Sequence, residues 1–157
     1  MAKSSSSSRR ALPPKRAVVD SGSLLALFVA TDRWHKPVLQ CLRTHQHVRL
    51  VTTWPVLTEV CALLARRLSN NAALDFLTWM QRGAIDLDCA ESSTFCDVLS
   101  MSERFADLPF DLADASVAEA AARLRIRAVL TIDSDFDVYR DTNGRPLRNL
   151  LSPVAAQ

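Results

Sequence analysis

Two aspartates follow short β-branched runs, where a strand is expected to end. Asp20 closes the apolar run of VVDSGS, and Asp133 closes that of VLTIDSDF, with Asp135 two residues later. Ligands of an open parallel sheet bind beyond the carboxyl ends of its strands, so acids at these positions are candidate site residues. A strand-end Asp is also a common helix cap, and Asp20 ahead of the apolar run from Leu24 fits that alternative equally well.

Two further acids lie in segments with helical spacing. Glu59 stands between Leu57 and Val60, which places it near a buried face, although an exposed helix Glu stays possible. Asp114 lies in DLADASVAEAA, where Asp111 can cap the helix. Acids in a first helical turn favour the helix dipole, so capping would explain both aspartates without a functional role.

Carboxylates from four separate segments suit a hard divalent cation. Mg²⁺ and Mn²⁺ take oxygen ligands and keep several waters, so a few carboxylates with little histidine suit them. The three histidines (His35, His45 and His47) lie outside these segments, which disfavours a His-based zinc centre.

The elements that must position these acids alternate between strands and helices. The pattern predicts strands at 17–19, 48–52, 84–87 and 128–132, a last edge strand at 147–151, and helices at 24–30, 34–45, 54–68, 71–83, 93–105 and 112–124. The expected caps are Thr53, Asn70 or Asn71, Ser92 or Ser93, and Asp111. Strands separated by helices of this length predict βαβ units, and therefore a three-layer α/β/α domain with a short parallel sheet.

The chain of 157 residues suits one domain, preceded by a segment of different composition. Residues 1–16 are Ser-rich and hold five bases and no acid, which predicts a flexible basic tail; residues 17–153 form the expected domain. Without the tail, residues 17–157 hold 14 bases against 17 acids. With 6% aromatic residues, an RNA-binding sheet that stacks bases on aromatic rings is not expected.

The cysteines and the hydropathy indicate the cellular environment. The four cysteines (Cys41, Cys61, Cys89 and Cys96) have no CxxC spacing, so we expect them to be reduced and buried. The longest purely apolar run, Leu24 to Ala30, is far too short to span a membrane. We therefore expect a cytoplasmic protein without a membrane partner.

Four segments together resemble the PIN domain family, and specifically the VapC-type toxins of bacterial toxin–antitoxin pairs. The matching segments are VVDSGSLLALF, the LTEV helix, DLPFDLADASVAEAA and VLTIDSDF, in this order, within a resemblance that runs from about residue 16 to 153. The resemblance implies an Mg²⁺- or Mn²⁺-dependent endoribonuclease with the acidic quartet Asp20, Glu59, Asp114 and Asp133. It also implies Asp135 as a fifth acid, Thr131 as a supporting hydroxyl, a partner antitoxin that blocks the site, and toxin dimerisation.

In this interpretation Asp20, Asp114 and Asp133 hold the cation, Asp135 assists a second one, and Glu59 orients water or assists proton transfer. The substrate would be RNA. Candidate cations for holding it are Arg66, Arg67, Arg123, Arg125, Arg127, Arg140, Arg145 and Arg148, although for most of them a solvated helix face is the better explanation. The sequence leaves the RNA-binding residues open.

Three other functions fit the sequence less well. A phosphoryl-transfer or receiver domain usually needs a late Lys, and the lysines here (Lys3, Lys15 and Lys36) are all early. A calcium loop starting at Asp133 fails, because Val138 and Gly144 stand where Gly and Glu are required. The remaining alternative is a PIN-fold RNA-binding or RNA-processing module outside a toxin–antitoxin system.

Overall fold

The structure is a computed structural model, and residues 13–152 are described here. The strands are β1 (Arg16–Val19), β2 (Arg49–Thr53), β3 (Asp86–Asp88), β4 (Ala128–Leu130) and β5 (Arg148–Asn149). The helices are α1 (Ser21–Phe28), α2 (His35–Thr44), α3 (Trp54–Arg67), α4 (Asn70–Gln81), α5 (Thr94–Arg104) and α6 (Leu112–Arg123), with a short 3₁₀ helix η1 (Ser134–Asp137). Most of the expected tail, residues 1–12, lies outside the described residues, and β1 begins at Arg16, one residue before the expected domain.

The five strands form one parallel sheet in the order β3-β2-β1-β4-β5. Val18 of the central strand β1 pairs with Val51 on one side and with Val129 on the other. All three valines are buried, as expected for parallel strands that helices cover on both faces. Since the strands are parallel, the carboxyl ends of β1 and β4 meet at one edge of the sheet and their amino ends at the opposite edge.

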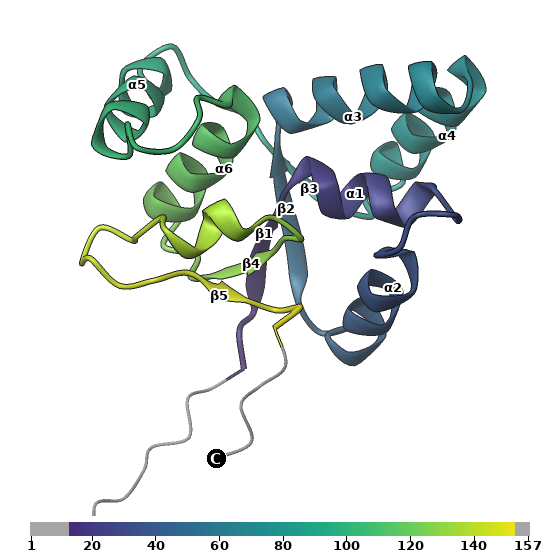
Figure 1. Ribbon diagram of the computed structural model, residues 1–157, viewed down its shortest axis with the longest axis horizontal. Helices are drawn as coiled ribbons and strands as arrows, with labels where there is room; N and C mark the ends of the chain where they lie inside the picture. Colours follow the sequence, from purple (N-terminus) through teal and green to yellow (C-terminus); the bar gives the residue numbers. More distant parts are fainter. Residues whose placement is uncertain (1–12, 153–157) are drawn as a thin grey trace, which may run out of the picture.

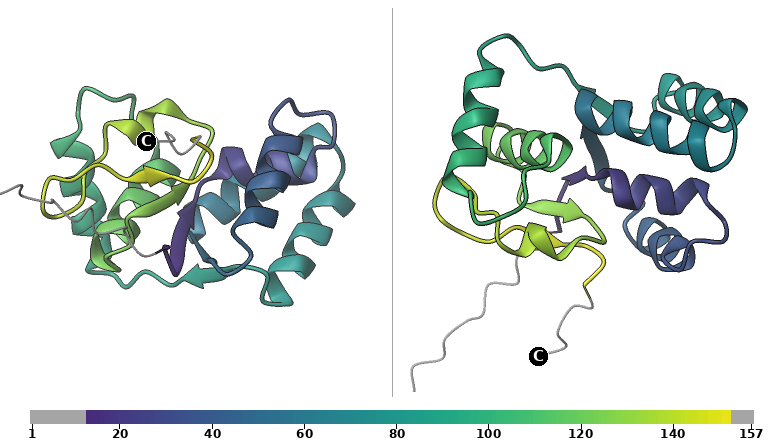
Figure 2. Two further views of the ribbon diagram at one scale, coloured as in Figure 1. Left: turned by 90° about the horizontal axis from the view of Figure 1, so that it is seen from below. Right: turned by 45° about the horizontal axis from the view of Figure 1, so that its top comes forward.

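The helices form a layer on each face of the sheet (Figures 1 and 2). Helices α1 and α2 pack together on one side, α5 and α6 on the other, and α3 packs against α1, α4 and α6. This arrangement confirms the predicted three-layer α/β/α fold. Within residues 13–152, no helix is long and apolar enough to cross a membrane.

Local sequence explains how the central helices dock. In α3, Val56, Val60 and Leu64 recur every four residues and are fully buried, so one face of the helix joins the core. Helix α6 is rich in alanine, and Ala115 and Ala120 are buried against its neighbours. Small side chains let α6 approach the sheet closely, which brings its first turn to the carboxyl edge.

The caps differ from expectation at some helices. Asp20 and Asp111 cap α1 and α6, since their carboxylates accept hydrogen bonds from backbone N–H groups in the first turns. Helix α4 is capped by Ser69 and not by Asn70 or Asn71, because the Ser69 hydroxyl already accepts the bond from the N–H of Ala72.

At two other helices the expected residue occupies the cap position, but its side chain makes no capping bond. The Thr53 hydroxyl at the start of α3 lies 2.6 Å from the hydroxyl of Ser116 on α6, and this contact replaces a cap. Ser93 precedes α5 in a helical conformation, without a capping bond from its side chain.

The expectation of four buried cysteines is wrong for two of them. Cys41 is buried and Cys61 is half-buried, but Cys89 and Cys96 are exposed. Cys89 follows the edge strand β3, and Cys96 lies on the outer helix α5, where only Thr94 is fully buried. All four thiols are free, as expected.

Candidate active site

Asp20 is the most deeply buried acid of the candidate site. It follows β1 and caps α1, and its side chain is 2% exposed. One carboxylate oxygen accepts the N–H of Ser23 at 2.9 Å, and the other accepts the hydroxyl of Thr131 at 2.6 Å. Burial raises the pKa of Asp20, and the nearby charge of Asp133 raises it further, while the two hydrogen bonds oppose that shift.

Thr131 links the two strand-end aspartates. While its hydroxyl donates to Asp20, it accepts the backbone N–H of Asp133 at 2.9 Å. Its backbone carbonyl accepts the side-chain amide of Asn149 at 2.9 Å, so β5 holds the segment after β4 in place. Asp133 then caps η1 by accepting the N–H of Asp135 at 2.9 Å. The sequence segment TIDSD therefore forms one hydrogen-bonded unit with Asp20.

Asp114 lies in the first turn of α6, and the charges of nearby acids raise its pKa. Its pKa is raised to about 7, first by burial and then by the charges of Asp111, Asp20, Asp133 and Glu59. Such mutual repulsion requires proximity, so the carboxylates that follow β1 and β4 share one region with those of α3 and of the start of α6. Glu59 makes the smallest contribution to this shift, and it is half-buried on α3.

The negative charge of this region has no cationic partner. Among the ion pairs of residues 13–152, none involves Asp20, Glu59, Asp114, Asp133 or Asp135. The Ser23 hydroxyl, which is buried in the first turn of α1, also has no hydrogen-bond partner within the described chain. Carboxylates without a cationic partner are the oxygen ligands that a hydrated hard cation takes.

The carboxylates do not yet form a compact chelating group. In the part of the chain described here, no three His, Cys, Asp or Glu side chains are close enough together to hold a metal ion by themselves. An ion bound by these acids would therefore be held partly through water, as Mg²⁺ commonly is.

Comparisons with known proteins bear on the fold that carries these acids. No family model matches the chain. It is 28% identical over 128 residues to Ribonuclease VapC26 of Mycobacterium tuberculosis, covering 81% of this chain and 94% of that protein. The crystal structure of M. tuberculosis VapC20, described as a Sarcin-Ricin loop cleaving toxin, matches with a TM-score of 0.73 and 21% identity, over 83% of this chain and 99% of that one. The chain has the PIN-like fold of VapC proteins.

A second solved structure extends this likeness. VapBC2 of Rickettsia felis, bound to a DNA fragment from its promoter, matches with a TM-score of 0.62 and 10% identity, over 85% of this chain and 98% of that one. The resemblance to VapC-type PIN toxins that the four sequence motifs predicted is thereby confirmed.

Within this VapC-like fold, sequence reasoning missed Tyr139. Its side chain is buried and its ring meets that of Phe105 edge-on, with centroids 5.0 Å apart. Burial raises the pKa of Tyr139 to about 12, with further contributions from the charges of Asp114, Asp135, Asp111 and Asp133. It is the single tyrosine of the chain, six residues after Asp133, which was the only available signal.

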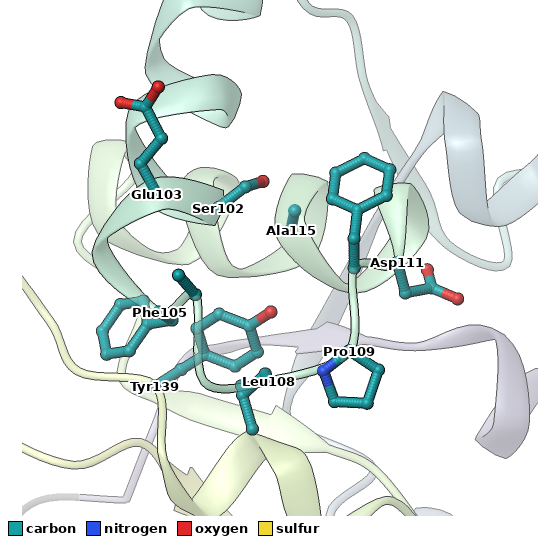
Figure 3. A pocket seen from close by; sticks show the side chains of 10 residues that line it. Ser102, Glu103, Phe105, Leu108, Pro109, Asp111, Ala115 and Tyr139 are labelled. Atoms are coloured by element: carbon teal, nitrogen blue, oxygen red, sulfur yellow. The ribbon is translucent and has the colours of Figure 1, made fainter.

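Tyr139 also lines a pocket beside the acids. The pocket has a volume of about 350 Å³ and lies between α5, the segment 105–111 and the start of α6. Figure 3 shows the Tyr139 hydroxyl directed into it, with Asp111 at one side. The acidic region therefore adjoins a partly apolar hollow.

Gly22 is the second residue that sequence reasoning missed. A Cβ at this position of α1 would lie 2.9 Å from Cγ1 of Ile132 and 3.5 Å from a carboxylate oxygen of Asp20. Only glycine lets the first turn of α1 approach the segment after β4 this closely. The DSGS motif thus serves packing at the site as well as capping.

Proposed function

We propose that this chain is an endoribonuclease that hydrolyses RNA phosphodiester bonds and acts as the toxin of a toxin–antitoxin pair. The observation that carries the proposal is the set of unpaired carboxylates around Asp114, whose pKa of about 7 reflects burial and the charges of its acidic neighbours. The names of the VapC relatives point to the same activity.

In this proposal Asp20, Asp114 and Asp133 hold Mg²⁺ or Mn²⁺, directly or through water, and Asp135 assists. A bound divalent cation lowers the pKa of its water and draws charge from a non-bridging phosphate oxygen. Glu59, half-buried on α3, orients the attacking water or accepts its proton. Thr131 acts as a positioning residue, because its hydroxyl fixes Asp20 and receives the N–H of Asp133.

Without a cation, the same acids would repel an RNA backbone. Burial first, and then the like charges of its neighbours, raise the pKa of Asp114 to about 7. Cation binding would favour the ionised carboxylates and offset part of their negative charge. RNA binding at this site therefore depends on the ion.

A ribonuclease assay tests the proposal. We expect the wild type to cleave RNA with Mg²⁺ or Mn²⁺ and not with EDTA, and Asp20→Asn and Asp114→Asn to lose about 100-fold or more in rate. Asp75→Asn is the matched control, because Asp75 is an exposed acid on α4. Equal cleavage by all variants would attribute the activity to a contaminant or another site. An inert wild type would favour the non-cleaving RNA-binding module instead.

We also propose two protein partners. The first is an antitoxin that covers the acidic region, which predicts growth arrest on expression of the chain alone and relief on co-expression with a neighbouring small reading frame.

The second partner is another copy of this chain. It would cover a hollow of about 390 Å³ between α3, α5 and α6, whose rim holds the exposed side chains of Trp54, Phe95 and Leu112.

A further inference from the structure

A basic hollow lies at the edge of the sheet opposite the acids. It has a volume of about 550 Å³ and is formed where β1, β4 and β5 begin and where α6 ends. Its lining contains five cations and no acid: Lys15, Arg16, Arg125, Arg127 and Arg148. We call this set the basic hollow.

Some of the cations near this edge form ion pairs with acids of the fold, and others form none. Arg123 is bound by Asp88 and Glu119, and Arg127 and Arg145 both pair with Asp141. A second group of cations, within residues 13–152, forms no ion pair at all and includes Lys15, Arg125 and Arg148.

Arg16 completes the hollow as a structural residue. Its guanidinium donates to the carbonyl of Leu124 at 3.0 Å, and its charge helps to lower the pKa of Asp86. This hydrogen bond joins the end of α6 to the start of β1, within the hollow. Lys15, Arg125 and Arg148 thus keep a positive charge that no ion pair of residues 13–152 offsets.

The topology fixes where the basic hollow lies relative to the acids. Arg16 and Asp20 stand at the two ends of β1, four residues apart, a span of roughly 13 Å at the rise of a parallel strand. A molecule that occupies both regions must therefore extend around the edge of the sheet. A dinucleotide held by the acidic region is too short to reach the basic hollow.

We propose that the basic hollow binds the phosphate backbone of the RNA substrate, several nucleotides away from the cleaved bond. This inference rests on the proposed function. Arginine predominates in the hollow, and its planar guanidinium matches phosphate oxygens with paired hydrogen bonds. Residues 17–157 carry more acids than bases, so a polyanionic substrate needs a localised cationic anchor.

The test removes charge without disturbing the fold. Arg125 has a φ of +56°, and it follows α6, where glycine or asparagine is favoured. Arg125→Asn therefore suits the backbone, and Arg148→Gln changes an exposed side chain at the edge of the sheet. The matched control is Arg43→Gln with Arg82→Gln, which removes the same charge from exposed positions on α2 and after α4.

Binding is measured by fluorescence anisotropy in EDTA, so that cleavage does not contribute. The hollow variant carries Arg125→Asn and Arg148→Gln together, and the control variant carries Arg43→Gln and Arg82→Gln. For a single-stranded RNA of about 20 nucleotides, we expect the hollow variant to bind on the order of tenfold more weakly than the control variant. Its slope of log affinity against log salt should fall by about 1.4, or about 0.7 for each lost phosphate contact. Equal affinities and equal slopes for the two variants would overturn the proposal.

Two further measurements separate this proposal from its neighbours. With Mg²⁺ or Mn²⁺, the hollow variant should have a higher KM for the long RNA and should cleave a dinucleotide at the wild-type rate. A loss of rate on the dinucleotide would contradict a remote anchor. Polyglutamate is the second probe. If the hollow variant loses polyglutamate binding but keeps RNA binding, the hollow serves an acidic protein and the proposal is wrong. The binding assay needs no cleavage. An inert enzyme would therefore contradict the proposed ribonuclease function, while the binding assay would still test whether the basic hollow binds RNA.

Discussion

At the scale of single residues, the site depends on one hydroxyl that serves two aspartates. Thr131 donates to buried Asp20 and accepts from the backbone of Asp133. A buried carboxylate that loses such a donor keeps the full cost of its desolvation. The pKa of Asp20, which burial already raises, would then rise further.

We therefore predict that Thr131→Val destabilises the protein by about 1–3 kcal/mol, as expected for a lost buried hydrogen bond to a carboxylate. Thr131→Ser keeps the hydroxyl and serves as the control. Urea unfolding at neutral pH measures both. If the valine variant were as stable as the serine variant, the hydrogen bond would contribute nothing to the fold.

Asp114 gives the protein a pH-dependent stability. Its pKa is about 7 in the folded chain against an ordinary value of 3.8, so the folded state holds a proton that the unfolded state releases at lower pH. Stability rises with pH only where the unfolded state binds more protons, and here it binds fewer. This carboxylate therefore lowers stability as the pH rises from about 4 to about 7.

In EDTA, we predict that the wild type unfolds at lower urea concentration at pH 8 than at pH 5.5, and that Asp114→Asn shows a smaller difference. Some dependence should remain in the variant, since the pKa of Asp20 is raised in the same direction. Adding Mg²⁺ should restore stability at pH 8, because the ion favours ionised carboxylates. A wild type that is more stable at pH 8 without metal would contradict this account.

At the scale of elements, the order and type of strands and helices could be predicted because apolar periodicity changes at each boundary. Some local features could not be predicted. Ser69, Asn70 and Asn71 are all good caps, and only the final path of the chain selects Ser69. Strand β4 ends at Leu130, two residues before its expected end, and η1 follows from Ser134, because the Thr131 hydroxyl and the Asp133 carboxylate bind the backbone between them.

Asp20 and Asp133 were candidates because they end apolar runs, and Glu59 and Asp114 because of helical spacing and the family resemblance. Tyr139 and Gly22 had no such signal. The position of Tyr139 depends on how η1 folds back toward α6, which is a long-range contact. The need for Gly22 comes from Ile132, more than a hundred residues away in the chain. Neither relationship leaves a local trace in sequence spacing.

We predict that Gly22→Ala destabilises the protein by about 1–3 kcal/mol, as overpacking usually does. In an unconstrained helix the same change would stabilise by about 0.5–1 kcal/mol, so the sign of the effect is decided by Ile132. The double variant with Ile132→Ala should recover part of the loss that Gly22→Ala adds, measured as a double-mutant cycle in urea. Additive effects would show that the close approach to Ile132 is not the cause.

At the scale of the whole molecule, the exposed apolar side chains between α3, α5 and α6 predict self-association. Phe95 and Phe110 are exposed to nearly the same degree, 72% and 73%, but only Phe95 lines the hollow proposed for a second copy. We predict that Phe95→Arg shifts the protein to a monomer in sedimentation velocity, while Phe110→Arg does not. A wild type that is monomeric at high concentration would exclude the proposed dimer.

The parallel sheet also keeps opposite charges at its two ends, with unpaired carboxylates beyond β1 and uncommitted arginines before it. Charges separated in this way give the folded chain a permanent dipole that unfolding would erase. At low ionic strength this dipole would favour the approach of a polyanion to the amino-terminal edge of the sheet. The topology of the sheet would thus orient the first encounter with the polyanion, before any contact with a base forms.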